Sequence, residues 1–485
     1  MTYKFHNPNR LSLTIILWTL ALIATITPPA SATGTTSPVQ VQMGGNRTVG
    51  RILSLELVVN SVQLVSSRGT TVTLVSRPYT MEQSHLAASS EVVGRADVPF
   101  GIYTRAVINA ANPHVVFLDN FGNIREARWT VATTSSIALP QSITITSAPS
   151  VVRITLDLAS LLKFDANQQT MLRGQPTFSV SQLSPARIGV DAEVAGEIEG
   201  SVGKAVAVTA SSFTLADSVS GLTTTYMTDT HTGYNGVSLA TMLNLIVRVH
   251  STIRKDGQNV AQEVSVAGSG QGSVVTGVIT DYTGGRVAVQ QIYGSGATTT
   301  ALGAYGTLAL DSTTAFQMDS RGMDLTGISL SFNAANLVAG QRIQFASRGA
   351  VHTNTSAGPS LTQVLTARLQ LQTIVGTVSN ISVAPNGSAS FDLALPANDG
   401  SALATLCEGA SLVRIVTQPL TKSSFLLTEG QHVRVRGLLL FDASSSGLQS
   451  SDFQSNGARV YVSVPRNTSD YYMIARSLQL DRSHN

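Results

Sequence analysis

The stretches LVAGQRIQF (residues 337–345) and LTEGQHVRV (residues 427–435) share the pattern Leu-x-x-Gly-Gln-x-apolar-x-apolar. A blurred third copy is LATMLNLIV (residues 239–247), in which Met242 takes the place of the glycine. The Gly-Gln pair predicts a tight turn, because glycine reaches positive φ without strain, and the alternation after it predicts a half-buried strand. Repetition of the pattern indicates that one small supersecondary plan is used three times.

Shorter motifs frame each copy. An apolar-x-Gly-x-apolar opening comes first: VAGEI (194–198), VTGVI (275–279) and IVGTV (374–378). Each unit closes on a small residue followed by alternating apolar positions: AQEVSV (261–266), TARLQL (366–371) and ARSLQL (475–480). We therefore predict three tandem β units at residues 193–268, 272–371 and 373–482. Five or six short strands per unit suit a small closed barrel, of OB type, or a reduced sandwich, because closure removes exposed strand edges.

A separate β domain is predicted for residues 47–185. Apolar residues alternate there from Val49 to Leu74, and Ser67-Arg68-Gly69 forms the turn of a hairpin. The predicted fold class is therefore all-β, with an antiparallel β-sandwich-like domain ahead of three small barrels. The two best helical patterns, Thr80 to Ser89 and Leu158 to Phe164, are each short enough to be a single turn.

The N-terminal residues 1–32 read as a secretory signal peptide. Lys4 and Arg10 precede an apolar run from Leu11 to Ile26, and an A-x-A cleavage site ends at Ala32. The alternative is a retained membrane anchor, although about 20 apolar residues are needed to span a bilayer. We expect cleavage after Ala32, a flexible leader at residues 33–46, no later transmembrane segment, and a secreted, periplasmic or cell-surface location.

The composition is typical of a β-rich extracellular protein. Charged residues make up 12% of the chain, well under the usual share, and the net charge of +3 falls to +1 without Lys4 and Arg10. This balance gives no indication of nucleic-acid binding, which needs a concentrated basic patch. The one cysteine, Cys407, cannot form a disulfide within the molecule, so stability must come from packed cores.

The N-terminal domain resembles a known family at VPFGIYTR (residues 98–105) and LDL (156–158). These stretches are similar to the P-x-G-x-Y-T entry and the apolar-Asp-apolar strand of the DUF4382 type, an exported bacterial domain family of unknown function. In physical terms, Pro99 and Gly101 make a turn that delivers Tyr103 into the sheet as an aromatic anchor.

The three later units resemble a second family of unknown function, the DUF5666 type. Its members are small β domains of exported bacterial proteins, often in tandem, with a T-x-F strand besides the motifs quoted above. Thr314-Ala315-Phe316 fits that strand, and Phe425 or Tyr234 would hold the equivalent aromatic position in the other units. We expect Tyr234, Phe316 and Phe425 to point into cores.

No cluster of residues predicts catalysis. The histidines are spread singly along the chain, at positions His6, His85, His114, His231, His250, His352, His432 and His484. None has the spacing that would put two on one face for a metal ion. Asp229 and His231 are close, but a surface turn outweighs a catalytic pair because nothing nearby supplies a nucleophile.

Three further patterns have weaker functional interpretations. GSGQG (268–272) lacks the helix and lysine of a phosphate-binding loop, so it is expected to be a linker. Asp392, Asp399 and Glu408 could hold calcium, but a solvated turn is favoured. Six arginines of the last unit could share a face that holds an anionic polymer, although ordinary outward-facing charge is favoured: Arg434, Arg436, Arg459, Arg466, Arg476 and Arg482.

The sequence therefore predicts an exported, non-enzymatic structural or interaction protein with no catalytic, cofactor or metal site. Its expected partner is a cell-surface polymer or another envelope protein, and not nucleic acid. The alternatives are a protein that binds a carbohydrate or anionic polymer, and a hydrolase whose acids meet only in three dimensions.

Overall fold

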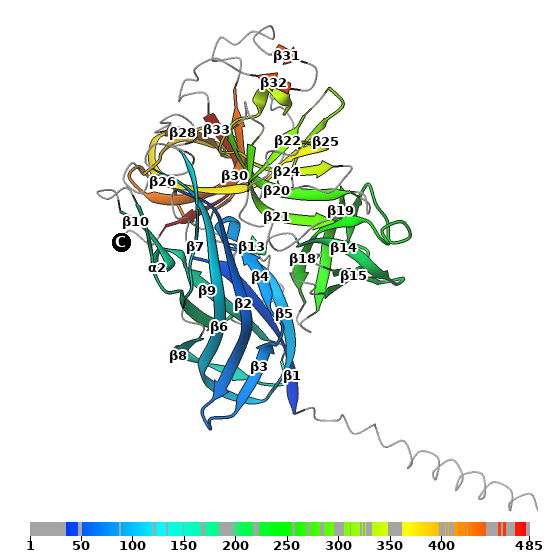
Figure 1. Ribbon diagram of the computed structural model, residues 1–485, viewed down its shortest axis with the longest axis vertical. Coiled ribbons are helices and arrows are strands. Elements are labelled where there is room, and N and C mark those ends of the chain that lie inside the picture. Colours follow the sequence, from blue (N-terminus) through cyan, green and yellow to red (C-terminus); the bar gives the residue numbers. More distant parts are fainter. Residues whose placement is uncertain are drawn as a thin grey trace, which may run out of the picture.

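The computed structural model contains four β domains, a sandwich followed by three barrels (Figure 1). It describes residues 35–46, 51–86, 89–119, 123–131, 134–148, 150–165, 170–183, 197–198, 201–216, 223–254, 258–268, 272–281, 286–294, 305–310, 312–320, 323, 325, 332–347, 361–396, 403, 406, 412–423, 425–442, 454–456, 459–461 and 471–481. Nearly all regular structure in these residues is strand, which confirms the predicted all-β fold class.

The sandwich consists of two sheets. The first sheet has the order β12-β9-β1-β5, built from β1 (Thr36–Gly45), β5 (Ser89–Pro99), β9 (Ser150–Asp157) and β12 (Thr177–Gln182). The second sheet comprises β2 (Ile52–Ser66), β3 (Thr71–Val75), β4 (Tyr79–Glu82), β6 (Gly101–Leu118), β7 (Ile124–Arg128) and β8 (Thr134–Ile145). A short hairpin of β10 (Leu162–Asp165) and β11 (Thr170–Arg173) lies beside them.

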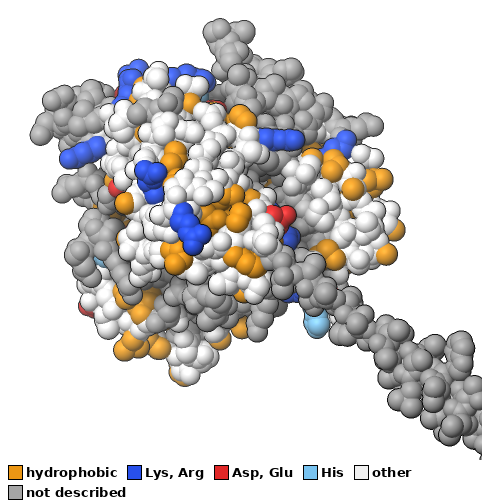
Figure 2. Space-filling model, turned by 90° about the horizontal axis from the view of Figure 1, so that it is seen from below, with side chains coloured by type: hydrophobic (Ala, Val, Ile, Leu, Met, Phe, Trp, Pro, Cys, Tyr) orange, Lys and Arg blue, Asp and Glu red, His pale blue; other side chains and the backbone are white. Residues whose placement is uncertain are grey.

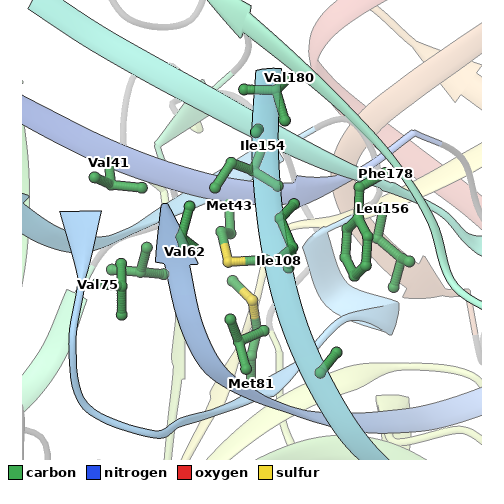
Figure 3. Close-up of a cluster of buried hydrophobic side chains, with 14 of the residues drawn as sticks. Val41, Met43, Val62, Val75, Met81, Ile108, Ile154, Leu156, Phe178 and Val180 are labelled. Atoms are coloured by element: carbon green, nitrogen blue, oxygen red, sulfur yellow. The ribbon is translucent and has the colours of Figure 1, made fainter. Parts of the chain in front are cut away.

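The core of the sandwich fills the space between the two sheets (Figure 3). Val41 and Met43 of the first sheet are fully buried there, and so are Val62 and Ile108 of the second sheet. Successive strand residues point to opposite faces, so the apolar alternation read from the sequence is what fills this core.

The expectation of a flexible leader at residues 33–46 is wrong for residues 36–45, because these form β1. β1 is a central strand, since it pairs with β5 on one side and with β9 on the other. The pair of β1 with β9 is parallel, whereas the pairs of β1 with β5 and of β9 with β12 are antiparallel, as expected for most of this domain.

Of the two helical predictions, the first is wrong and the second is correct for its first turn. Thr80 to Ser89 is not a helix, since it holds the end of β4, a 3₁₀ turn at Ser84–Leu86 and the start of β5. Leu158 to Phe164 begins with the single helical turn α2 (Leu158–Leu161), whose N-cap is Asp157, and continues as β10. A single turn was the expected length there.

Tyr103 is the buried anchor that the sequence predicts. Its side chain is 3% exposed, and its hydroxyl donates a hydrogen bond to the carbonyl oxygen of Pro99 at 2.9 Å. Burial raises the pKa of this phenol.

The three barrels share one strand plan. Barrel 1 is built from β14 (Ser201–Val208), β15 (Ser212–Ala216), β16 (Thr223–Met227), β18 (Ile246–Ile253) and β19 (Asn259–Gly268). Barrel 2 is built from β20 (Ser273–Asp281), β21 (Arg286–Gly294), β22 (Tyr305–Ala309), β24 (Arg342–Ser347) and β25 (Leu361–Leu369). Barrel 3 is built from β26 (Gln372–Val383), β27 (Ala389–Ala394), β28 (Leu412–Val416), β30 (His432–Phe441) and β33 (Tyr471–Leu480).

Each barrel closes in the same way. The first strand pairs with the second and fourth, and the third strand pairs in parallel with the fifth, as β16 does with β19. A further short strand pairs in parallel with the fifth: β17 (Gly233–Asn235), β23 (Ala315–Met318) and β29 (Lys422–Ser423). Two other short strands of the described chain, β31 (Gln454–Asn456) and β32 (Arg459–Tyr461), form a hairpin of their own. Closed five-stranded barrels of this kind are OB-like, which confirms the barrel prediction over the reduced sandwich.

The opening glycine lies where the first strand passes too close to the backbone of the second strand for a side chain to fit. A Cβ atom on Gly376 would lie 2.4 Å from the carbonyl oxygen of Ala394, and one on Gly203 would lie 2.7 Å from that of Ala216. Gly203 therefore opens barrel 1, and the VAGEI stretch assigned to this role was the wrong one. Its residues Glu197–Ile198 instead form β13, which pairs with β5 at the edge of the first sheet.

The Gly-Gln turn has a clear structural basis. Gly430 has a φ of 79°, and the side chain of Gln431 accepts a hydrogen bond from the backbone N–H of Thr428 at 2.9 Å. Gln341 closes the turn of barrel 2 in the same way. In barrel 1 the residue with positive φ is Asn244, at 69°, so Met242 does not replace the glycine as the sequence suggested.

A threonine fastens the short strand of each barrel to the fifth strand. The hydroxyls of Thr232, Thr314 and Thr421 donate to main-chain carbonyls of β19, β25 and β33 at 2.7, 2.9 and 2.8 Å. The T-x-F motif therefore owes its threonine to this hydrogen bond. The position two residues later, Phe316 in barrel 2, is held by Ser423 in barrel 3, so Phe425 does not take the equivalent aromatic place.

The barrels are packed against one another. Leu438, Leu440 and Ile474 of barrel 3 belong to the hydrophobic core cluster of barrel 2, and Gln341 donates to the carbonyl oxygen of Leu439 at 3.0 Å. Barrels 1 and 2 meet through a smaller apolar cluster and a buried ion pair. In that pair Arg248 Nη1 lies 3.7 Å from Asp319 Oδ2.

Candidate functional site

A row of ionisable side chains crosses the second sheet of the sandwich, on the face turned away from its core. Strand register places Glu82 of β4 opposite Glu56 of β2, Glu56 opposite His114 of β6, and His114 opposite Arg128 of β7. Side chains directly opposite each other lie on the same face of a sheet. The neighbours of His114 on β6 alternate with it, since Val115 belongs to the sandwich core.

His114 lies between two carboxylates. Its Nδ1 atom is 3.7 Å from Glu56 Oε2, and its Nε2 atom is 3.4 Å from Glu126 Oε2. The side chain of His114 is 1% exposed, and those of Glu56 and Glu126 are 10% and 43% exposed. These three side chains are called the His114 cluster below.

The charge of His114 is set by two opposing effects. Burial by itself lowers the pKa of the imidazole, but the carboxylates of Glu126 and Glu56 together outweigh burial and raise this pKa above its ordinary value. The charge of Arg128, the strand partner of His114 on β7, also lowers the pKa of the imidazole, as burial does. The imidazole therefore keeps its proton to a higher pH than a free histidine does.

Glu82, at the end of the row, accepts hydrogen bonds from nearby parts of the chain. Its Oε1 atom accepts hydrogen bonds from the backbone N–H of Leu55 at 2.7 Å and of Ser84 at 3.0 Å, and from the Ser84 hydroxyl at 2.6 Å. Glu82 thus fixes the chain where β4 ends.

The His114 cluster borders the contact between the sandwich and the barrels. Leu53, Val116 and Leu118 form a buried cluster against which Val278 of barrel 2 and Leu406 of barrel 3 pack. Val116 lies two residues beyond His114 on the same face of β6, and its partner on β7 is Glu126. We call this apolar contact the junction. Glu126 lies in the same row of the sheet as Val116, and His114 and Glu56 lie in the adjacent row.

The His114 cluster can bind and release a proton near neutral pH, which is the ordinary chemistry of histidine. Among the described residues, no group of three or more His, Cys, Asp and Glu side chains is arranged to hold a metal ion. Sequence reasoning treated His114 as isolated because its partners come from other strands. The alternation of Glu126 with Arg128 was the available signal, since it puts both on one face of β7.

His231 and Asp229 lie in an exposed turn, as predicted. The His231 side chain is 92% exposed, and its Nδ1 atom is 3.7 Å from Asp229 Oδ1. Of the other histidines, His6, His352 and His484 lie outside the described residues, and so does the side chain of His85. His250 and His432 lie on strands of different barrels.

Asp392 lies on strand β27 and not in the solvated turn that the sequence favoured. Its carboxylate pairs with Arg414, whose Nε atom is 2.6 Å from Asp392 Oδ1, and accepts a hydrogen bond from Asn380 Nδ2 at 2.9 Å. Asp399 and Glu408, its proposed calcium partners, lie outside the described residues, as does most of the GSGQG linker.

The described arginines of barrel 3 have structural roles. Arg434 donates to Asp481 at 2.8 Å, and Arg436 and Arg476 are each 7% exposed. These three do not form an open basic face. The side chains of Arg459, Arg466 and Arg482 lie outside what the structure describes.

The three aromatic residues differ in their surroundings. Phe316 packs against the core of barrel 2 and contacts Phe332 edge to face, with ring centroids 5.7 Å apart. Phe425 packs against the core of barrel 3. The prediction of core positions is confirmed for these two and wrong for Tyr234, which is 38% exposed.

The end of the sandwich away from the barrels exposes hydrophobic side chains. Phe100 is 43% exposed and Ile102 is 50% exposed, where β5 passes into β6. Figure 2 looks onto this end and shows hydrophobic side chains gathered with a few Lys and Arg side chains on a largely uncharged surface.

In the described part of the chain, no helix is long and apolar enough to cross a membrane. Comparison of the chain with protein-family models gives no match, and comparison with the curated proteins gives none either.

Proposed function

We propose that this protein is an exported, non-enzymatic scaffold that acts in interactions at the cell envelope or outside the cell. The observation that carries the proposal is the packing of the four domains on one another. Barrels 2 and 3 share a core cluster, and both contact the sandwich at the junction. A chain built in this way holds its surfaces at fixed relative positions, which is what a scaffold requires.

The charge pattern supports the same proposal. Charged side chains are scarce, and several of the described ones are used inside the molecule, such as the pairs Arg248–Asp319 and Arg434–Asp481. A polar but weakly charged surface suits contact with another envelope protein, because little charge has to be desolvated on binding.

Export is the part of the proposal that an experiment tests first. The full chain is expressed in a didermal bacterium, the cell is fractionated, and the N-terminus of the product is sequenced. We expect the mature chain outside the cytoplasm, starting directly after Ala32. An intact chain that stays in the cytoplasm would reject export.

We further propose that the sandwich is a DUF4382-like domain and that the barrels are DUF5666-like domains. Tyr103 supports the first assignment, because the P-x-G-x-Y-T motif gives this residue a definite anchoring role. The threonine hydrogen bond and the Gly-Gln turn support the second, because both recur at matching places in barrels 2 and 3.

The competing function, binding of an anionic or carbohydrate polymer, is tested separately. The mature chain is applied to heparin at low salt and to a glycan array. We expect no retention on heparin, because Arg434, Arg436 and Arg476 are paired or buried. Strong retention that weakens as salt is added would favour the polymer-binding function, since screening reduces electrostatic binding.

A further inference from the structure

We propose that the junction between the sandwich and the barrels is sensitive to pH, and that His114 is the group that senses it. The protonated imidazole holds Glu56 and Glu126 in place beside the junction. Loss of its proton loosens the contact that Leu53, Val116 and Leu118 make with Val278 and Leu406.

Geometry ties the ionic cluster to the junction. His114 and Val116 follow each other on one face of β6, and Glu126 is the strand partner of Val116. A change in the position of Glu126 therefore reaches an apolar junction residue directly. His114 is fully enclosed, so water cannot readily replace a lost carboxylate partner.

The charged groups that face the imidazole come from β2 and β7, and Glu82 of β4 lies next along the row. β2 contributes Glu56, β7 contributes Glu126 and Arg128, and β4 contributes Glu82, whose carboxylate is engaged by backbone N–H groups. Beyond Leu118, at the far end of β6, Asp119 pairs with Arg125 at 3.0 Å and so carries its own counter-charge. His114 is thus the cation between Glu56 and Glu126.

Loss of the proton leaves two carboxylates in the cluster with an uncharged imidazole between them. A neutral imidazole between two carboxylates leaves Glu56, which is 10% exposed, without its cationic partner. A buried carboxylate without a partner is costly, and the cost is relieved if the sheet moves and admits water. The junction lies directly beside the cluster, because Glu126 is the strand partner of Val116.

The direction of the pH effect follows from linkage. The folded-state pKa of His114 lies above its ordinary value of about 6.5. The stability that this group contributes is therefore fully present below about pH 6.5, and it is lost as the pH rises through the folded-state pKa. The junction is expected to be tight in mildly acidic solution and looser in alkaline solution.

Hydrogen exchange of the mature chain tests the proposal. Protection factors, which are corrected for the intrinsic pH dependence of exchange, are measured by mass spectrometry between about pH 5.5 and about pH 8.5. We expect protection of β6, β7 and β20 near the junction to fall by about tenfold for each unit by which the folded-state pKa exceeds the ordinary value. Strands far from the junction, such as β15, should keep their protection.

Three variants make the test decisive. His114→Gln should abolish the pH dependence at the junction, while His231→Gln should leave it unchanged. The second is a matched control, because His231 also lies 3.7 Å from a carboxylate but is 92% exposed. Should His114→Gln fail to fold, Glu126→Gln serves instead, and its transition should move to lower pH.

Two results would overturn the proposal. One is protection at the junction that does not change with pH in the parent chain. The other is a pH dependence that stays the same in His114→Gln, or whose midpoint stays the same in Glu126→Gln.

Discussion

At the scale of single residues, the three barrels use different amino acids at the same position of one turn. The turn before the fourth strand has one residue with positive φ in each barrel: Gly340, Gly430 and Asn244. Asparagine is among the few residues with a side chain that adopts this conformation readily, because its amide can bond to the local backbone. The barrels therefore show which substitutions the turn accepts.

Gly430 allows this reasoning to be tested. A Cβ atom at Gly430 would meet nothing within 4 Å, so a substitution there costs backbone strain alone. Gly430→Ala should destabilise the protein by about 1–2 kcal/mol, the cost of the left-handed conformation for a residue with a Cβ. Gly430→Asn, which copies barrel 1, should cost clearly less, as measured by urea unfolding. Equal losses in the two variants would show that the turn does not depend on φ.

The turn residue of barrel 1 could not be identified correctly from the sequence. Met242 was aligned with the turn glycines by its distance from Leu239, yet the structural equivalent is Asn244. In barrel 1 Leu245 stands where the other barrels have the turn-closing glutamine, so the motif has lost both of its diagnostic residues. Spacing alone could not recover the register, because register is fixed by pairing between β14 and β18.

At the scale of elements, the threonine hydrogen bond is a device that each barrel uses to hold a short strand. In barrel 3 the Thr421 hydroxyl accepts from the backbone N–H of Gln418 at 2.7 Å and donates to the carbonyl oxygen of Ala475 at 2.8 Å. A strand as short as β29 has few ladder bonds of its own, so this side chain supplies much of its attachment.

Replacing this threonine should loosen the short strand. Thr421→Val keeps the shape of the side chain but removes both hydrogen bonds, and the loss of these two bonds should cost about 1–3 kcal/mol. Thr421→Ser keeps the hydroxyl and should cost less. Equilibrium unfolding in urea measures both values. A valine variant as stable as the parent would mean that the hydrogen bond contributes nothing net.

Some elements were predictable from the alternation of apolar residues. The fourth strands of barrels 2 and 3 were predicted from their alternation, although both of their faces are largely buried in the structure. β1 was missed although Val39, Val41 and Met43 alternate, because its other residues suggested a linker. What makes it a strand is pairing with β5 and β9, which are distant in sequence. The His114 cluster was missed for the same reason.

At the scale of the whole molecule, the two interfaces between barrels differ in chemistry. Barrels 2 and 3 share leucine and isoleucine side chains of one core cluster. Barrels 1 and 2 join through a small cluster around Ile246 and Val274, together with the pair Arg248–Asp319, whose side chains are 3% and 5% exposed. Barrel 1 is therefore the domain whose attachment depends most on a buried charge pair.

Removing one member of this pair should weaken the attachment of barrel 1. Arg248→Met breaks the ion pair with the buried Asp319 carboxylate, and breaking a buried pair typically costs about 3–5 kcal/mol. The double variant Arg248→Met with Asp319→Leu should recover much of the loss, because two apolar side chains can replace a buried pair. Urea unfolding followed together with limited proteolysis between barrels 1 and 2 reads out both effects. Losses that simply add would argue against coupling of the two residues.

The central claim is that the four domains form one body, and small-angle X-ray scattering of the mature chain tests it most directly. A compact protein of this length has a radius of gyration of about 23 Å. The packing at the junction and between the barrels predicts a value near this one, with the scattering profile of a single compact particle. A value half as large again, with the profile of domains on flexible links, would contradict it.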